Sequence, residues 1–364
     1  MSGISDRPHG LIVHSQAPFN AEPHLDRLRR SFITATDDFY VRSHGLVPHL
    51  DPASHAITID GRVDHPLRLT VADLKAQFSP RSVVATMQCA GNRRADLQQV
   101  RPTSGDPWSA GAIGNAEWTG VSLADVLRAA GAGFEAAWHV AFEAADLADN
   151  EGAEPAPYGV SIPMPKAMSN EVLLAWGMNG EPLRSEHGAP LRVVVPGYAG
   201  VRSPKWLTSI RVQHSPSDAV QQRLDYRLFP SHIQKGDDDI ACGTPINQMP
   251  LNAALCEPSD GAVLKRGPTM LRGYAIATER AVTRVELSID DGATWYQATI
   301  EPHDRQPWSW TFWGAEVTLN PGRYQLTVRA WDAAGQTQPS RPHDVWNHKG
   351  YLSAAWHQVR VSVE

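Results

Sequence analysis

Residues 82–94 read Ser-Val-Val-Ala-Thr-Met-Gln-Cys-Ala-Gly-Asn-Arg-Arg. The first part is a strand-like apolar run that ends at Cys89, and the second is a turn that carries Arg93 and Arg94. A cysteine acts as a metal ligand or nucleophile only as the thiolate, and neighbouring guanidinium groups favour that form. The same guanidinium groups can hold a small oxyanion beside the sulfur. The pattern therefore predicts a redox metal on Cys89 with an anionic substrate next to it.

The motif Cys-Ala-Gly-Asn-Arg-Arg at 89–94, followed by Trp108, resembles that of the sulfite oxidase family of molybdopterin enzymes. Other stretches resemble the family in the same order along the chain: 40–44, 118–127, 158–163, 193–197, 205–207 and 346–347. The resemblance implies an α+β molybdopterin domain followed by an all-β immunoglobulin-like sandwich. It also implies that Cys89 is the one protein ligand to molybdenum.

The composition is typical of a globular chain with many turns. Of 364 residues, 42% are hydrophobic and 20% are charged, with 28 Gly and 28 Pro. This length favours two domains over one. The formal net charge of -6 argues against a general nucleic-acid or anionic-membrane partner. No stretch approaches the roughly 20 apolar residues needed to span a bilayer.

The N-terminus begins with polar residues and contains no apolar signal-peptide core. Arg29 and Arg30 resemble the start of a twin-arginine export signal, but no apolar segment follows them. We therefore interpret them as part of the folded chain. The expected location is the cytoplasm, or the periplasm if a leader is missing from this sequence.

The three cysteines, Cys89, Cys242 and Cys256, form neither a Cys-x-x-Cys pair nor a Cys-x-x-Cys-His haem site. We interpret Cys242 and Cys256 as ordinary thiols, with pairing between them left open. Because two domains account for the length, we expect no haem and no flavin in this chain.

The first two segments expected along the chain are an extended lead-in over 1–38, with Pro8, Pro18 and Pro23, and a catalytic domain over 39–243. Alternation predicts a strand over 57–61, and a short apolar run predicts another over 191–195. Helical spacing predicts helices over 71–78 and 122–130, with Ser122 as N-cap and Gly131 at the end. This mixture indicates an α+β domain.

The third expected segment covers 244–364 and is all-β. Apolar and polar residues alternate over 285–289, 308–312 and 324–328, and an Asp-Asp-Gly turn occupies 290–292. Such short strands with turn signals between them indicate a β-sandwich. The resemblance implies that this sandwich is a dimerisation domain and that the protein is a homodimer.

The resemblance assigns the substrate site to Arg42, Arg94 and Tyr226. A planar guanidinium offers paired donors for two oxygens of an oxyanion, and a phenol can pass a proton. Tyr158 is the rival for the tyrosine role, and Trp108 is expected as an aromatic wall of the anion pocket. At the position of Lys349, animal sulfite oxidases carry an arginine of that pocket, so we expect Lys349 to supply the third charge. Lys205 is the alternative source of that charge.

The pterin and its phosphate require many hydrogen-bond donors. The positions that match the family's cofactor-binding motifs are Tyr40, Val41, Arg42, Ser43, His44, Cys89, Asp146, His187, Arg192, Ser203, Pro204 and Lys205. The two histidines among them are expected to hydrogen-bond the cofactor rather than to bind metal. Because His187 and Arg192 flank a Gly-Ala-Pro stretch, we expect their side chains to converge across a turn.

The expected function is oxidation of sulfite, or a similar small oxyanion, by oxo transfer at a molybdenum-molybdopterin cofactor. Electrons are expected to pass to oxygen or to an external acceptor such as a cytochrome. The alternative is a reductase of nitrate or of an S-oxide that uses the same site. Nitrate reductases carry haem and flavin domains in the same chain, and methionine sulfoxide reductases usually lack the sandwich. A non-catalytic cofactor carrier is a further alternative, against which the cysteine, arginines and tyrosine argue.

Overall fold

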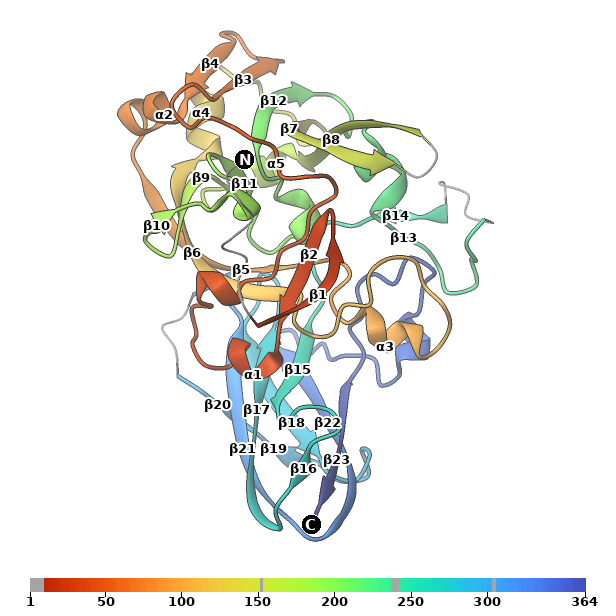
Figure 1. The fold of residues 1–364 in the computed structure, drawn as a ribbon. Helices are drawn as coiled ribbons and strands as arrows, with labels where there is room; N and C mark the ends of the chain where they lie inside the picture. The colour runs from red at the N-terminus through yellow and green to blue at the C-terminus, as the bar shows by residue number, and fades with distance from the viewer. Residues whose placement is uncertain (1–9, 151–152, 237–241, 303–305) are drawn as a thin grey trace.

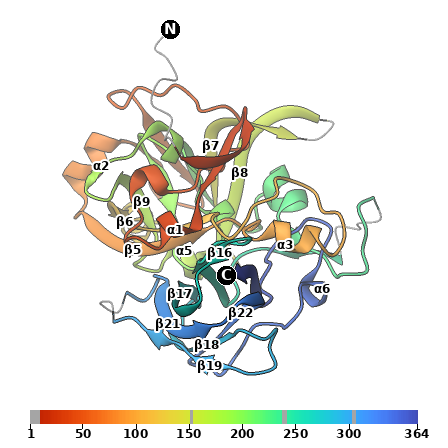
Figure 2. The same cartoon turned by 60° about the horizontal axis from the view of Figure 1, so that its bottom comes forward.

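The computed structural model describes residues 10–150, 153–236, 242–302 and 306–364. A part that mixes strands with short helices lies at one end of the molecule, and a β-sandwich that carries the C-terminus lies at the other (Figure 1). This arrangement confirms the predicted fold class of an α+β domain followed by an all-β sandwich. In Figure 2 the sandwich end is turned toward the viewer, and the mixed part lies above the sandwich.

Two five-stranded sheets build the mixed part. In the first, the order is β10 (Glu181–Pro182), β9 (Leu173–Met178), β6 (Ile113–Ser122) and β5 (Arg81–Gln88), with β11 (Arg192–Val194) paired to β9. In the second, the order is β4 (Leu67–Thr70), β3 (Ala56–Gly61), β12 (Leu207–Gln213), β7 (His139–Asn150) and β8 (Ala153–Pro163). Fully buried side chains from both sheets, including Ile57, Val121, Leu174 and Ile210, share one hydrophobic core.

Four short helices connect these strands: α2 (Val71–Gln77), α3 (Arg94–Gln98), α4 (Leu123–Ala129) and α5 (Met164–Ala167). Helix α2 confirms its prediction and begins with a capping box, in which Thr70 Oγ1 accepts from the Asp73 amide and Asp73 accepts from the Thr70 amide. Helix α4 confirms the second helix and starts after Ser122, which makes no side-chain cap bond. Gly131 follows the helix end with a φ of 68°, a conformation that favours glycine.

The expected extended lead-in is wrong for residues 11–38. They form the hairpin of β1 (Leu11–Gln16) and β2 (Phe19–Pro23), helix α1 (Leu25–Leu28) and a 3-10 turn, Thr36–Asp38. Pro18 lies in the hairpin turn and Pro23 is the last residue of β2. These prolines therefore mark the ends of strands and not an extended segment. Pro8 and the rest of 1–9 lie outside the described residues.

The sandwich consists of two facing sheets. One has the order β15 (Asn252–Glu257), β17 (Gly267–Ile276), β21 (Thr311–Leu319) and β20 (Thr299–Ile300). The other has the order β16 (Val263–Leu264), β23 (His357–Val363), β22 (Gly322–Asp332), β18 (Val282–Ser288) and β19 (Tyr296–Gln297). Buried residues of both sheets, such as Leu255, Leu287, Trp313 and Val328, form its core.

Two small elements complete the described fold. Strand β13 (Arg227–Leu228) pairs with β14 (Thr244–Pro245), and α6 (Pro342–Val345) is a short helix. Strands β15 to β23 pair with one another. Because these strands pair only among themselves within the described residues, we propose that the sandwich domain begins near residue 244, as the sequence predicts.

A hydrophobic cluster joins the two domains. Leu28 of α1 and Ile113 of β6 pack against Tyr274, Trp310 and Phe312 of the sandwich. The strand expected over 308–312 begins only at Thr311, because residues 308 and 310 bond to strand β5 instead. The Thr86 amide donates to the Trp308 carbonyl at 2.9 Å, and the Trp310 amide donates to Thr86 Oγ1 at 2.8 Å. The junction is therefore both packed and hydrogen-bonded.

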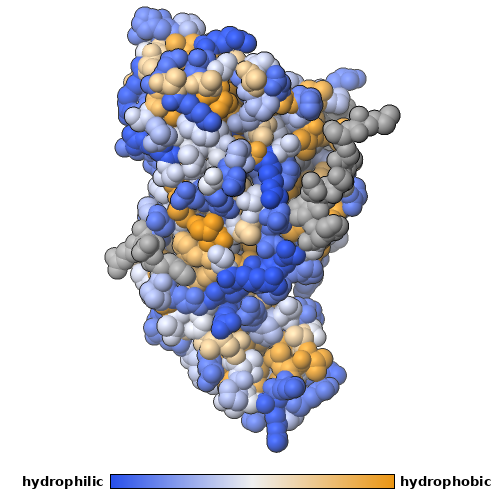
Figure 3. Space-filling model, turned by 60° about the vertical axis from the view of Figure 1, so that its left-hand side comes forward, coloured by the Kyte–Doolittle hydropathy of each residue, from blue (hydrophilic) through white to orange (hydrophobic). Residues whose placement is uncertain are grey.

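The surface shows mostly hydrophilic residues on one face, with hydrophobic residues in separate patches (Figure 3). Exposed large hydrophobic side chains, among them Leu46, Phe134 and Val263, are scattered along the described chain. Among the described residues, the helices are all too short or too polar to cross a membrane.

Candidate active site

A cavity lies in the mixed domain beside the C-terminal end of strand β5. Every residue predicted to bind the cofactor lines this cavity, and Tyr226, Tyr158 and Met87 line it as well. These side chains come from the 40–44 segment, strands β5, β7, β8 and β11, and the 200–206 and 221–226 segments. The fold therefore brings together residues that lie up to 186 positions apart, from Tyr40 to Tyr226.

Cys89 follows directly after strand β5, which confirms the predicted strand and turn. Its amide donates to the Ala112 carbonyl at 2.9 Å, so the pairing with the neighbouring chain segment continues through the cysteine. The Gly91 amide donates to Cys89 Sγ at 3.4 Å. Burial raises the pKa of the Cys89 thiol, while the charges of Arg42 and Arg94 act to lower it. A metal cation at the sulfur would add a further charge that favours the thiolate.

Arg42 is the cation that faces both Cys89 and Tyr226. Burial acts to lower its pKa, but the neighbouring Tyr226 and Cys89 raise it above the ordinary value. Arg42 Nη1 donates to the Ser43 carbonyl. Arg42 is therefore a fixed positive charge beside the sulfur, as an oxyanion site requires.

Tyr226 and His44 form a hydrogen-bonded pair, with 2.6 Å between the phenol oxygen and His44 Nε2. Burial raises the pKa of Tyr226 to about 12, and burial together with Arg42 and Lys205 lowers the pKa of His44 well below its usual range. A neutral imidazole beside a protonated phenol can accept its proton in a hydrogen bond. The pair can therefore orient the Tyr226 proton within the cavity.

Tyr158, the rival tyrosine, lines the same cavity, but its hydroxyl is bound to the backbone. Its hydroxyl donates to the Val201 carbonyl at 2.7 Å, and its ring lies 4.8 Å from the His44 ring. Because a backbone carbonyl already binds its proton, Tyr158 is less suited than Tyr226 to pass that proton to a ligand.

The far wall of the cavity is cationic. Arg192 reaches across the turn at 188–190 and donates to the backbone carbonyls of His187 and Ser203 at 2.9 and 3.0 Å, and His187 and Arg192 both line the cavity. Lys205 Nζ donates to Ser43 Oγ at 2.7 Å and to the Glu186 carbonyl at 2.9 Å. These hydrogen bonds of both side chains thus go to neutral oxygens, and the carboxylates of Asp146 and Glu186 act on Lys205 through their charge alone.

Asp146 is a carboxylate that lines this wall. Burial raises its pKa above the ordinary value, whereas burial lowers the pKa of Lys205, and the two groups interact. Three cations, Arg42, Arg192 and Lys205, therefore share the lining with two acids, Glu186 and the buried Asp146. The excess of positive charge fits the phosphate of a pterin cofactor, and the buried Cys89 sulfur fits a soft metal.

Arg94, Trp108 and Lys349 lie outside the lining of this cavity. Arg94 is the first residue of α3 and is 6% exposed, with Nη1 donating to the Asp106 carbonyl at 2.8 Å and Nε to the Lys349 carbonyl at 3.2 Å. Lys349 is half-buried and holds Arg94 through its backbone. Trp108 is fully buried, with its ring 4.7 Å from the His14 ring. The roles expected for these three residues stay predictions.

Glycines make room for the Arg94 side chain. A Cβ at Gly91, Gly105 or Gly350 would lie within 2.5–2.9 Å of Arg94 atoms, and Gly105 and Gly350 also have positive φ angles of 91° and 65°. Three separate backbone segments thus approach one arginine more closely than any other residue type allows. This packing fixes the direction of the side chain.

Residues that the sequence analysis did not single out also contribute to the site. The Tyr351 ring stacks on Tyr226 at 5.2 Å and lies 5.3 Å from the Arg94 guanidinium. Tyr351 could have been predicted from the sequence, because it lies two residues after Lys349, which the sequence analysis places at the anion pocket. Asp106 holds Arg94 through its carbonyl, and no motif in the sequence marks it.

The comparisons with known proteins agree with this geometry. Residues 44–221 match the oxidoreductase molybdopterin binding domain, and residues 243–364 match the Mo-co oxidoreductase dimerisation domain. A buried cysteine in a cationic cavity of such a domain defines the class as a molybdopterin oxidoreductase, and molybdenum-molybdopterin is its cofactor.

The chain belongs to the sulfite oxidase family. It is 39% identical over 366 residues to the sulfite oxidase of Gallus gallus, covering 98% of this chain and 79% of that protein. It is likewise 39% identical over 367 residues to the mitochondrial sulfite oxidase of Homo sapiens, again over 98% of this chain but only 66% of the human protein. The sulfane dehydrogenase SoxCD of Paracoccus pantotrophus has a similar structure, with a TM-score of 0.79, 25% identity, and coverage of 98% of this chain and 92% of that one.

Proposed function

We propose that this protein oxidises sulfite to sulfate. The observation that carries the proposal is the shared cavity of Cys89, Arg42 and the Tyr226–His44 pair. The reaction adds one oxygen atom from water and releases two electrons and two protons. When bound, the molybdenum cofactor supplies the oxo transfer and accepts the electrons.

In this proposal the chain itself binds the substrate, orients it and handles a proton. Arg42 offers paired donors to two sulfite oxygens, and Arg94 adds a second positive charge. Tyr226 holds a proton at its hydroxyl, and His44 keeps that hydroxyl oriented through the 2.6 Å bond. Cys89 binds the metal, while Arg192 and Lys205 hold the cofactor phosphate.

The oxyanion site favours sulfite over an S-oxide substrate. An S-oxide is neutral, so a buried arginine such as Arg42 would gain no ion pair on binding it, whereas sulfite carries negative charge. Nitrate is also an anion, with a single charge, so it fits the site better than an S-oxide does. An assay of nitrate reduction distinguishes a nitrate reductase from a sulfite oxidase.

The experiment is a steady-state assay of the molybdenum-loaded protein with sulfite. Oxygen is tried first as electron acceptor, then cytochrome c, and nitrate and methionine sulfoxide are tested with a reduced dye. We expect sulfite turnover with one of the two acceptors. Reduction of nitrate or S-oxide in the absence of sulfite turnover would contradict the proposal.

We also propose that the sandwich mediates a homodimer with two-fold symmetry, the commonest closed symmetry. The match of residues 243–364 to a dimerisation domain supports this proposal. Light scattering is expected to give twice the chain mass of 39.8 kDa at micromolar concentration, and a monomer mass would contradict it.

A further inference from the structure

Strand β2 binds both of the segments that carry Arg42 and Arg94. On one side, Ala21 and Val41 exchange two backbone hydrogen bonds of 2.9 Å each. Next to this pair, the Ser43 amide donates to Asn20 Oδ1 at 2.8 Å. Strand β2 thus holds the residues on both sides of Arg42 in place.

On the other side, β2 holds the loop that fixes Arg94. Asn20 Nδ2 donates to the Asp106 carboxylate at 3.1 Å, and the carbonyl of the same Asp106 accepts from Arg94 Nη1 at 2.8 Å. Two residues further along β2, Glu22 accepts from the amides of Ser109 and Gly111 at 2.7 and 2.9 Å. Alternate side chains of β2, Asn20 and Glu22, therefore bind one loop.

Asn20 is the point where the two sides meet. Its oxygen binds the Arg42 segment, and its nitrogen binds the Arg94 loop. The side chain is 4% exposed, and the neighbouring Glu22 is fully buried, so water does not compete for these bonds. Only an amide side chain offers a donor and an acceptor at this length, because a carboxylate cannot donate.

We propose that Asn20 is a positioning residue, which sets the separation of Arg42 and Arg94 and thereby the affinity of the pocket for its oxyanion. The inference rests on the proposed function, since it takes both arginines as ligands of the substrate. Asn20 itself does not touch the substrate in this account. Its loss should therefore change oxyanion binding more than the chemical step.

The first test is Asn20→Asp in the molybdenum-loaded protein. It places two carboxylates where the amide bonds Asp106, so the link to the Arg94 loop is lost. We expect the KM for sulfite and the dissociation constant of sulfate, measured by calorimetry, to rise about tenfold, while kcat per molybdenum changes less than about threefold.

The second test is the double variant Asn20→Asp, Asp106→Asn. The amide and the carboxylate exchange places, so the hydrogen bond is restored and the net charge equals that of the wild type. We expect both constants to return to within about threefold of the wild-type values. Failure of this rescue would show that the bond between the two positions is not what matters.

Asn115→Asp is the matched control. Asn115 is also fully buried and donates to the Phe32 carbonyl and accepts from Thr86 Oγ1, both at 3.0 Å, but these partners do not line the cavity. We expect this variant to lower the thermal midpoint and to leave both constants unchanged.

The proposal is overturned if Asn20→Asp leaves both constants unchanged, or if Asn115→Asp raises them equally. The sulfate measurement separates this inference from the proposed function. If the wild type binds sulfate without oxidising sulfite, the proposed function fails, and sulfate binding by the Asn20 variants still decides the role of Asn20.

Discussion

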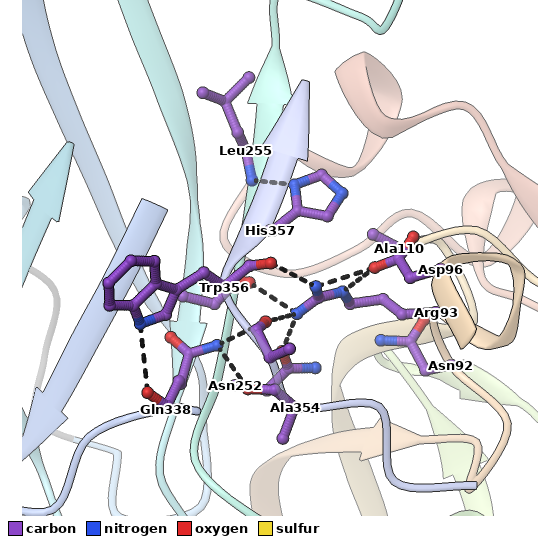
Figure 4. Close-up of polar contacts among 12 residues, drawn as sticks. Asn92, Arg93, Asp96, Ala110, Asn252, Leu255, Gln338, Ala354, Trp356 and His357 are labelled. Atoms are coloured by element: carbon purple, nitrogen blue, oxygen red, sulfur yellow. Dashed lines mark hydrogen bonds and ion pairs between the residues drawn. The ribbon is translucent and has the colours of Figure 1, made fainter. Parts of the chain in front are cut away.

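Arg93 and Arg94 are neighbours in the chain, but they point to two regions that balance buried charge in different ways. Arg93 belongs to the domain junction, and Arg94 lies beside the active-site cavity without lining it. Arg93 is fully buried and donates to Asp96, Asn252 and the carbonyls of Ala355 and Trp356, at distances of 2.7–3.3 Å (Figure 4). Protein oxygens, most of them from the sandwich, therefore surround its guanidinium on several sides.

In the active-site pocket, by contrast, positively charged side chains outnumber the acids that line it. Arg42, Arg192 and Lys205 line it together with the acids Asp146 and Glu186. Arg192 and Lys205 donate to neutral groups, namely carbonyl and hydroxyl oxygens and the Met87 sulfur. A buried charge needs a partner or strong hydrogen bonds. At the junction the protein itself provides them, whereas under the proposed function an anionic cofactor and substrate would complete them in the pocket. The same residue type thus stabilises the fold in one region and binds ligands in the other.

Replacing Cys89 by Ser is expected to have the largest effect, and it acts only on the pocket. A hydroxyl is harder and ionises far less readily than a thiol, so the metal loses its protein ligand. Sulfite turnover should fall below detection, while the thermal midpoint of the protein stays near the wild-type value. Wild-type turnover per molybdenum in this variant would refute the assignment of Cys89.

Replacing Arg93 by Met tests the junction. It removes the donor that binds Asp96, Asn252 and the carbonyls of Ala253, Ala355 and Trp356. The cost should be about 3–5 kcal/mol, typical of breaking a buried charged network. Urea unfolding should show this loss, while the folded enzyme keeps a KM for sulfite within about threefold of wild type. Arg93→Lys keeps the charge but loses the planar donors, so its unfolding free energy should lie between those of the wild type and Arg93→Met. An unchanged unfolding midpoint in Arg93→Met would show that Arg93 does not stabilise the domain junction.

Arg42→Gln should give the converse result. Losing a charged hydrogen-bond donor is worth about 1.5–3 kcal/mol, so kcat/KM for sulfite should fall roughly ten- to hundredfold. Because Arg42 is not part of the junction network, the unfolding free energy should change little. An unchanged kcat/KM at low ionic strength would place Arg42 outside the substrate site.

His357 provides a pH test of the junction. Its Nδ1 accepts from the Leu255 amide at 3.1 Å, and burial lowers its pKa from 6.5 to about 4. Arg93 acts in the same direction, against the carboxylates of Asp96 and Asp260. The unfolded state binds the proton first, so this stability is complete above pH 6.5 and is lost as the pH falls toward 4.

The size of this loss is on the order of 3 kcal/mol. It should appear in urea unfolding curves measured across that pH range. His357→Gln removes the titrating group and should make the unfolding free energy less dependent on pH. Equal pH dependence in both proteins would show that His357 titrates normally.

Lys349→Met should have the smallest effect. Lys349 holds Arg94 through its carbonyl, which every residue type retains, and its half-buried side chain lies outside the cavity lining. We expect a KM increase worth less than about 1 kcal/mol, typical of a partly exposed charge. Lys349→Arg should match or lower the wild-type KM. A much larger effect of Lys349→Met would make this lysine the third cation of the substrate site.

The sequence by itself determined the local elements and the residues that meet in the cavity. The apolar run before Cys89, the spacing around Leu74 and the alternation over 285–289 reflect local backbone preferences, which need no distant partner. The family motifs identified the cavity residues because each motif carries its own residue types. The predicted β-sandwich was confirmed for the same local reason.

Only the tertiary structure decided how Arg93 and Arg94 differ and what residues 11–38 do. Arg93 meets partners about 160 and 262 positions away, and Asn20 meets Asp106 across 86 positions. Nothing in the local pattern of either residue records these partners. Hydrogen bonds of this kind form only after distant segments pack together, so their energy depends on the fold and leaves no periodic signal in the chain.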